Sequence, residues 1–149
     1  MSGSLDHSPS QIIRQMLVDL SLGTLPSEDD DWPIFATNEP DTPDSVITVY
    51  DTLGKLDGRT QVDGKLQIHH GFQVRIRDAN TRNGYSKANA IAIALDESTY
   101  QETVTISDSI YLVHSVSRTT DVLPIGKETP TSKRNIFTIN ATATLRQTA

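Results

Sequence analysis

Residues 69–95, HHGFQVRIRDANTRNGYSKANAIAIAL, decide the fold because they join a strand to a helix through a short polar turn. In the strand part, alternate residues from Leu66 onward share one largely apolar face: Leu66, Ile68, His70, Phe72, Val74 and Ile76. The other face carries Gln67, His69, Gln73, Arg75 and Arg77. This alternation predicts a strand with one face in the core and the other in water.

The second part of the stretch predicts a helix that begins after the polar turn. Asp78 or Asn80 can cap its N-terminus with a side-chain oxygen. Apolar residues then recur at helical spacing, with a stripe formed by Tyr85, Ala88, Ile91, Ala92 and Leu95 and extended by Ala90, Ile93 and Ala94. The small alanines should let this helix lie close to a neighbouring element.

Further elements flank this centre. Ser8 and Pro9 predict the start of a first helix, which should end near Leu22 and Gly23, with the glycine in the left-handed conformation. Strands are expected at residues 32–37, where Pro33 favours a sheet edge, and at residues 44–51, 103–106 and 109–118. A final strand should turn Phe137, Ile139, Ala141, Ala143 and Leu145 inward and Thr138, Asn140, Thr142, Thr144 and Arg146 outward.

This order of elements predicts an α+β protein, with a mainly antiparallel β-sheet and two α-helices packed on one face. A chain of 149 residues has the size of one domain, so residues 1–149 are expected to form a single domain with a flexible start over residues 1–7. Glycine, proline and aspartate residues predict two long loops, at residues 52–65 and 119–133.

Composition and charge restrict the class of protein. The chain has no cysteine, which excludes a disulfide framework and a thiolate nucleophile. No secretion signal or bilayer-spanning run is apparent, which predicts synthesis in the cytoplasm and no membrane partner.

Residues 1–50 hold nine acidic residues and one basic residue, a net charge of −8, whereas residues 51–149 hold ten acidic and twelve basic residues, a net charge of +2. The acidic run Glu28, Asp29, Asp30 and Asp31 is most simply a solvated loop, or else one pole of a molecule with unlike surfaces.

No catalytic or metal-binding residue stands out, and no cofactor is expected. His69 and His70 are neighbours on a strand and point to opposite faces, so they cannot chelate one metal ion. The segment VLPIGKET lacks the glycine and the Ser or Thr of a phosphate-binding loop, and no serine lies in a G-x-S-x-G turn. An enzyme is therefore a minority interpretation, although a triad of His114, Ser115 and an aspartate stays open.

The polar face of the predicted sheet brings four arginines together: Arg75, Arg77, Arg134 and Arg146. A dedicated nucleic-acid binder is usually strongly basic and offers aromatic side chains on which bases stack. This chain has a net charge of −6, and that face lacks such aromatics. The face is better explained as a polar wall along which something passes.

The sequence resembles a family of small bacteriophage proteins. The segments that carry the resemblance are WPIFAT, DTPDSVITVYDT, LDGR, the stretch at residues 69–95 and the closing segment SVSRTTDVLPIGKETPTSKRNIFTINATATL. They are similar to minor capsid or tail-completion proteins, which in turn resemble the tail terminators of long-tailed phages. Arg134, Phe137, Thr138 and Asn140 match the family pattern, whereas residues 60–65 depart from it.

The resemblance implies a structural subunit of the virion that assembles as a ring, typically of six, on the head-proximal end of the tail tube. Such a ring stops tube polymerisation and joins the tail to a neck or head-completion protein, and double-stranded DNA passes through it only as cargo. No catalysis is implied. Two other functions remain open: a head-completion or adaptor protein of the same virion, and a small ligand-binding domain or hydrolase.

Surface residues can be assigned to these contacts as predictions. The polar sheet face should line the lumen or meet the tube through Gln73, Arg75, Arg77, Arg134, Thr138, Asn140 and Arg146. The long loops should reach a neighbouring subunit or a partner through Asp57, Arg59, Lys65, Ile125 and Lys127, and residues 28–31 should form an acidic patch. Reversing the charges of Arg75 and Arg77 together should then block tail joining without unfolding the subunit.

Overall fold

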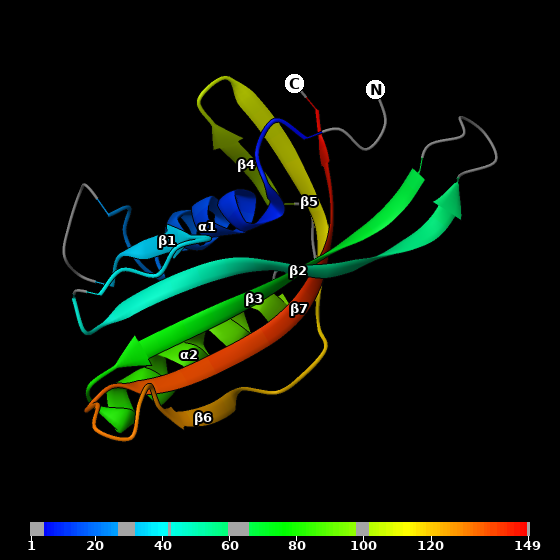
Figure 1. Cartoon of the computed structure of the whole chain (residues 1–149). Coiled ribbons are helices and arrows are strands. Elements are labelled where there is room, and N and C mark those ends of the chain that lie inside the picture. Colours follow the sequence, from blue (N-terminus) through cyan, green and yellow to red (C-terminus); the bar gives the residue numbers. More distant parts are fainter. Residues whose placement is uncertain (1–4, 27–31, 42, 60–65, 98–101, 149) are drawn as a thin grey trace.

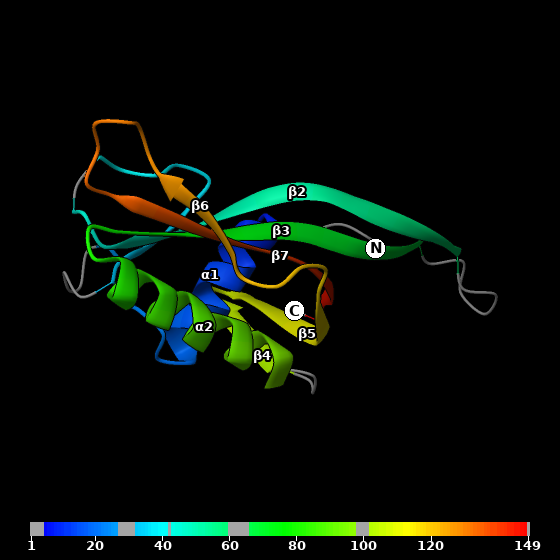
Figure 2. The same cartoon turned by 90° about the horizontal axis from the view of Figure 1, so that it is seen from below.

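A computed structural model describes residues 5–26, 32–41, 43–59, 66–97 and 102–148 of the chain (Figure 1). Within these ranges seven strands form one sheet in the order β1-β2-β3-β7-β5-β4, with β6 beside β7. All pairs are antiparallel except that of β1 (Ile34–Ala36) with β2. Figure 2 shows both helices on the same side of β2, β3 and β7. The predicted α+β class and layer arrangement are confirmed.

The centre of the sheet is formed by β2 (Val46–Arg59), β3 (Leu66–Asp78) and β7 (Asn135–Gln147). The alternation seen in the sequence holds, because Phe72, Val74 and Ile76 are fully buried on the face that meets the helices. They lie opposite Ala141, Ile139 and Phe137 of β7. Apolar residues of two strands that are distant in the sequence therefore meet on one face and create the core.

Helix α1 (Pro9–Asp19) begins as its sequence predicts. Ser8 is the N-cap and forms a capping box with Gln11, and Pro9 takes the first helical position. The helix ends earlier than predicted, and Ser21, not Gly23, has the positive φ of 63°. Gly23 is needed for another reason: a Cβ there would meet the backbone oxygen of Trp32 and lie 2.7 Å from the Ile34 side chain.

Helix α2 (Thr81–Glu97) is capped by Asn80, whose Oδ1 accepts hydrogen bonds from the backbone N–H of Arg82 and Asn83 at 2.9 and 3.2 Å. Its buried stripe is narrower than predicted and consists of Gly84, Ala88, Ile91, Ala92 and Leu95. Tyr85 and Ile93 are about half exposed, so their predicted places in the stripe are wrong. Among the residues that the structure describes, neither helix is suited by length and hydropathy to cross a membrane.

The second half of the sheet contains β4 (Glu102–Ile106) and β5 (Ser109–Arg118). The pairing of β5 with β7 shifts register between Val113 and Ser115, which places the half-buried His114 at an irregularity. This shift explains why the apolar period of β5 is blurred, since Tyr111, Val113 and Val116 are all buried although their spacing changes. The Arg118 guanidinium donates to both Asp96 oxygens at 2.7 and 2.8 Å, tying α2 to β5, and lowers the pKa of that carboxyl below its ordinary value.

Both predicted long loops contain strand. β2 continues to Arg59, so the loop expected over residues 52–65 is wrong over its first half. The Asp and Gly residues that suggested turns there coincide with register shifts between Thr52 and Lys55 and between Leu56 and Gly58. The loop expected over residues 119–133 contains β6 (Leu123–Lys127), which tolerates Pro124 because it pairs only with β7 among the described strands.

The start of the chain makes side-chain contacts with β5 and β7. The Asp6 carboxylate accepts hydrogen bonds from the Gln147 side chain at 2.7 Å and from the Ser109 hydroxyl at 3.2 Å. His7 Nδ1 lies 2.6 Å from the Tyr111 hydroxyl. These contacts involve Asp6 and His7, residues 1–4 lie outside the described residues, and flexibility of residues 1–7 stays a prediction.

Candidate assembly surface

The face of β2, β3 and β7 turned away from the helices carries rows of polar side chains. The strand register aligns Tyr50 with Gln73 and Gln73 with Asn140. Gln73 Nε2 donates a hydrogen bond to Asn140 Oδ1 at 3.1 Å, and both side chains remain partly exposed. Further along the strands, His69 Nδ1 lies 3.0 Å from Thr144 Oγ1. The expected lattice of polar side chains is therefore present on this part of the face.

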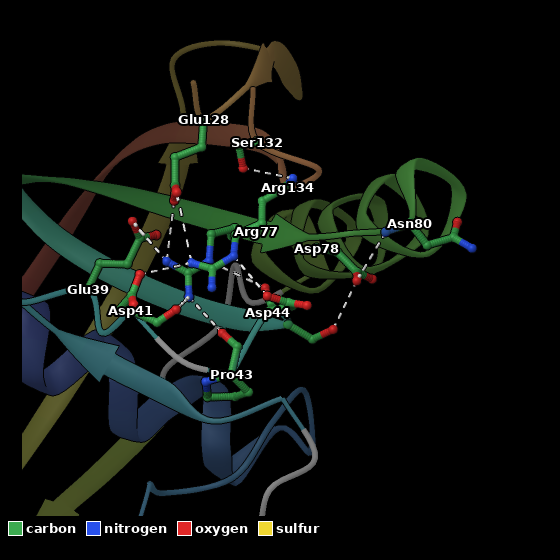
Figure 3. A network of polar contacts seen from close by, with 11 residues as sticks. Glu39, Asp41, Pro43, Asp44, Arg77, Asp78, Asn80, Glu128, Ser132 and Arg134 are labelled. Carbon is green, nitrogen blue, oxygen red and sulfur yellow. Dashed lines mark hydrogen bonds and ion pairs between the residues drawn. The ribbon is translucent and has the colours of Figure 1, made fainter. Parts of the chain in front are cut away.

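Arg77 departs from the expected pattern, because it lies on this polar face but is only 2 % exposed. Its guanidinium donates hydrogen bonds to three backbone oxygens of the segment before β2, at 3.1 Å to Asp41, 2.6 Å to Pro43 and 3.3 Å to Asp44. It also faces two carboxylates, Glu39 at 3.6 Å and Glu128 at 3.4 Å (Figure 3). Glu39, Asp41, Pro43 and Asp44 cover Arg77, so in this structure its side chain is not available for the predicted contact with the lumen or the tube.

Arg134 and Thr138 are also less available than predicted. Arg134 pairs with Asp44 at 2.8 Å, Asp41 at 3.4 Å and Glu128 at 3.8 Å, and its side chain is 17 % exposed. Thr138 is 2 % exposed, in a register position opposite Arg75 and beside β6. These residues contribute to the cover at one end of the face rather than to an open surface.

Two other predicted arginines keep some access to solvent. Arg75 lies 3.4 Å from Glu39, and its side chain is 32 % exposed. Arg146 is exposed on β7. The combined charge reversal of Arg75 and Arg77 is therefore no test of this surface, because Arg77 is buried and its substitution would disturb the fold.

The acidic partners of Arg77 and Arg134 were missed by the sequence reasoning. Glu39, Asp41 and Asp44 lie in NEPDTPD, a segment whose two prolines suggest only an irregular connection. Their proximity to two arginines of β3 and β7 becomes visible only when the strands are aligned (Figure 3). The acidic patch predicted from residues 28–31 lies outside the described residues.

The predicted contact loops occupy two separate places. Asp57 and Arg59 belong to β2, and Lys65 lies outside the described residues. Ile125 and Lys127 are exposed on β6. The two groups are not brought together, because β6 pairs with the N-terminal part of β7 and β2 does not pair with β7.

A two-stranded extension, here called the arm, consists of residues 53–59 of β2 and 66–69 of β3. The pairing of β3 with β7 stops at His70, whereas its pairing with β2 continues to Leu66. Figures 1 and 2 show β2 and β3 continuing together away from the helices. Leu53, at the base of the arm, is 97 % exposed. Apart from the contact of His69 with Thr144 of β7, no described strand pairs with either edge of the arm.

Close backbone contact shapes the base of the arm. A Cβ at Gly71 would meet the backbone oxygen of Leu53 and lie 2.5 Å from Thr52 Oγ1. A Cβ at Gly54 would meet the backbone oxygen of His69. Glycine at these two positions lets β2 and β3 approach at the irregular part of their register, which is where the arm leaves the sheet.

An open hollow of about 280 Å³ holds His70 near a carboxylate, the arrangement that an enzyme would need. The carboxylate is Asp51, and it accepts hydrogen bonds from the backbone N–H and the hydroxyl of Ser10 at 2.9 and 3.0 Å. These bonds fasten the first turn of α1 to β2, which is a structural role. Within the described part of the chain, no three His, Asp or Glu side chains are grouped so as to hold a metal ion.

Burial lowers the pKa of His70 below its ordinary value of 6.5, although the nearby Asp51 charge acts in the opposite direction. The unfolded chain therefore takes up this proton first as the pH falls. We expect the contribution of His70 to the free energy of unfolding to be lost as the pH falls from 6.5 through the lower folded-state pKa. Urea unfolding above and below pH 6.5 measures this loss. In His70→Gln, the free energy of unfolding should fall less steeply as the pH is lowered. An unchanged slope would contradict the assignment.

Comparison with known proteins identifies the family of this chain. A family model for bacteriophage tail terminator protein matches residues 13–147, which extend from within α1 to the end of β7. A comparison with curated proteins gives no significant match. The family match confirms the resemblance seen in the sequence. The matched residues include those of the polar face and of the arm. The chain therefore belongs to the bacteriophage tail terminator family.

Proposed function

We propose that this protein forms a ring, of six subunits, that caps the head-proximal end of the phage tail tube. In that position the ring ends tube polymerisation and joins the tail to the neck or head-completion protein, with double-stranded DNA passing through it as cargo. Family membership makes the chain a structural protein of the phage tail, and the ring is the finer part of the proposal. The observation that carries this finer part is the uncovered arm.

The arm supports assembly because of its energetics. A two-stranded hairpin is at best marginally stable in water without a third strand or a packed face. In this chain the arm continues beyond the last residue pair between β3 and β7 and exposes Leu53. A neighbouring molecule that covers the arm would supply the missing contacts.

The charge distribution also suits a cyclic ring. Each subunit of such a ring presents two different surfaces, which contact each other on neighbouring copies. The segment before β2 presents Asp41 and Asp44, whose side chains pair with Arg134 and remain 96 % and 57 % exposed. Exposed acidic groups near one end of the sheet can guide subunits into a single orientation, since complementary fields steer association.

The open part of the polar face is the surface that we assign to the lumen or the tube. It retains four of the residues predicted for this role: Gln73, Arg75, Asn140 and Arg146. Gln73 and Asn140 are partly exposed and form a hydrogen bond with each other, so this part of the face can border water or a polar partner.

Deleting the gene tests the proposal directly. We expect tail tubes of abnormal length, because without a cap nothing stops the addition of tube subunits, and we expect few tails joined to heads. Electron microscopy of lysates gives the tube length distribution, and supplying the protein from a plasmid is the control. Tubes of normal length accompanied by unjoined heads would instead support the head-completion role.

A further inference from the structure

Two incomplete features lie at opposite ends of the β3–β7 pair. At one end, β3 loses its partner β7 beyond His70 and continues only as part of the arm. At the other end, β6 pairs with residues 135–138 of β7, which in turn face residues 75–78 of β3. The arm of a subunit is therefore directed away from its own β6, as Figure 1 also shows.

β6 has the properties of a receiving surface. All five of its residues are exposed, and its only strand partner among the described residues is β7. Leu123 is 52 % exposed and Ile125 is 59 % exposed. These two large apolar side chains lie on a five-residue edge strand, and an edge strand can accept contacts from another molecule.

The arm offers a matching apolar group. Leu53 is 97 % exposed, more than Tyr85, Ile93, Leu123 or Ile125. Its covering by another molecule would remove apolar surface from water, which favours association. The same contact would cover Leu123 and Ile125.

We propose that the arm of one copy packs over β6 of the next copy, with Leu53 against Leu123 and Ile125. Pro124 lacks an N–H and interrupts a continuous ladder, so side-chain packing supplies most of this contact. Because the protruding arm and the receiving strand are different surfaces at opposite ends of one subunit, repetition of the contact is head-to-tail and can close into a ring. This inference rests on the proposed ring function and identifies its subunit interface.

Because the chain has no cysteine, introduced cysteines are the only thiols of this protein that a cross-linking reagent can join. The variant Leu53→Cys/Ile125→Cys, in the full chain, is treated with a short bis-maleimide reagent after isolation of the ring fraction, either free in solution or bound to tail tubes. We expect the monomer band to be lost into a ladder of covalent multimers. A mixture of the two single variants should give dimers and no ladder.

Matched controls separate this contact from chance collisions. Leu53→Cys/Ile93→Cys places the second thiol on α2, at a side chain of similar exposure to that of Ile125, and it should leave the monomer band unchanged. Each single variant treated alone shows whether the same cysteine on two copies can be cross-linked. Circular dichroism verifies that all variants are folded.

The outcomes distinguish the interface from the ring. A ring in which Leu53→Cys/Ile125→Cys stays uncross-linked would overturn the arm-to-β6 contact and leave the proposed function intact. Cross-linking of Leu53→Cys to the tail tube protein alone would also overturn it, since the arm would then serve the tube. Failure to find any ring, with or without tubes, would contradict both the interface and the capping function.

Discussion

Arg77→Ala should lower the free energy of unfolding by about 3–5 kcal/mol, the loss typical when one partner of a buried ionic network is removed. The guanidinium satisfies three backbone oxygens of residues 41–44 and faces the carboxylates of Glu39 and Glu128. Alanine would leave these oxygens poorly solvated, and the carboxylates would lose a compensating charge. Urea unfolding at neutral pH, followed by circular dichroism, measures the loss.

Arg75→Ala is the matched control, because Arg75 lies two residues away on the same strand face and also pairs with Glu39. Its side chain is about one third exposed, so its removal should cost only about 0–1 kcal/mol. Arg77→Lys should recover only part of the loss, since an ammonium cannot reproduce the planar, forked donor arrangement of arginine. Equal stabilities of Arg77→Ala and Arg75→Ala would show that Arg77 does not hold the segment in place.

Gly71→Ala should give the second large effect, with a loss of about 1–3 kcal/mol as for other overpacked buried positions. The added methyl group would collide with the backbone of Leu53, which cannot move without changing the path of β2. The base of the arm would then twist differently, and the arm would no longer be presented to a neighbour. We expect lower stability in urea unfolding together with loss of the ring in light scattering.

Thr52→Ala is the control for Gly71→Ala. It removes the hydroxyl that the new methyl group would also meet but leaves the backbone collision unchanged. Thr52 is exposed, so the single variant should stay within about 0.5 kcal/mol of the parent protein. Combining the two substitutions should restore little stability. Full recovery in the double variant would mean that the hydroxyl, and not the backbone, makes glycine necessary at position 71.

Much of the candidate surface could be predicted because it depends on strand periodicity. Gln73 and Asn140 were assigned to one face from alternation alone, and the register places them side by side. The assignment of Arg77 used the same rule and gave the correct face, but the wrong environment. Alternation says which side of a sheet a residue is on, and it contains no information about a distant segment that covers that side.

The sequence by itself determined the local elements: the cap at Ser8, a capped helix start at Asp78 or Asn80, the apolar alternation of β3 and β7, and the α+β class. These features depend on residues a few positions apart, whose geometry is set by the backbone. Only the tertiary structure decided that Asp41, Pro43 and Asp44 enclose Arg77 and that the arm extends past β7. The cover of Arg77 depends on which connection crosses the polar face, and the arm depends on how strands of different lengths align. Such long-range contacts leave no periodic signal in any one segment.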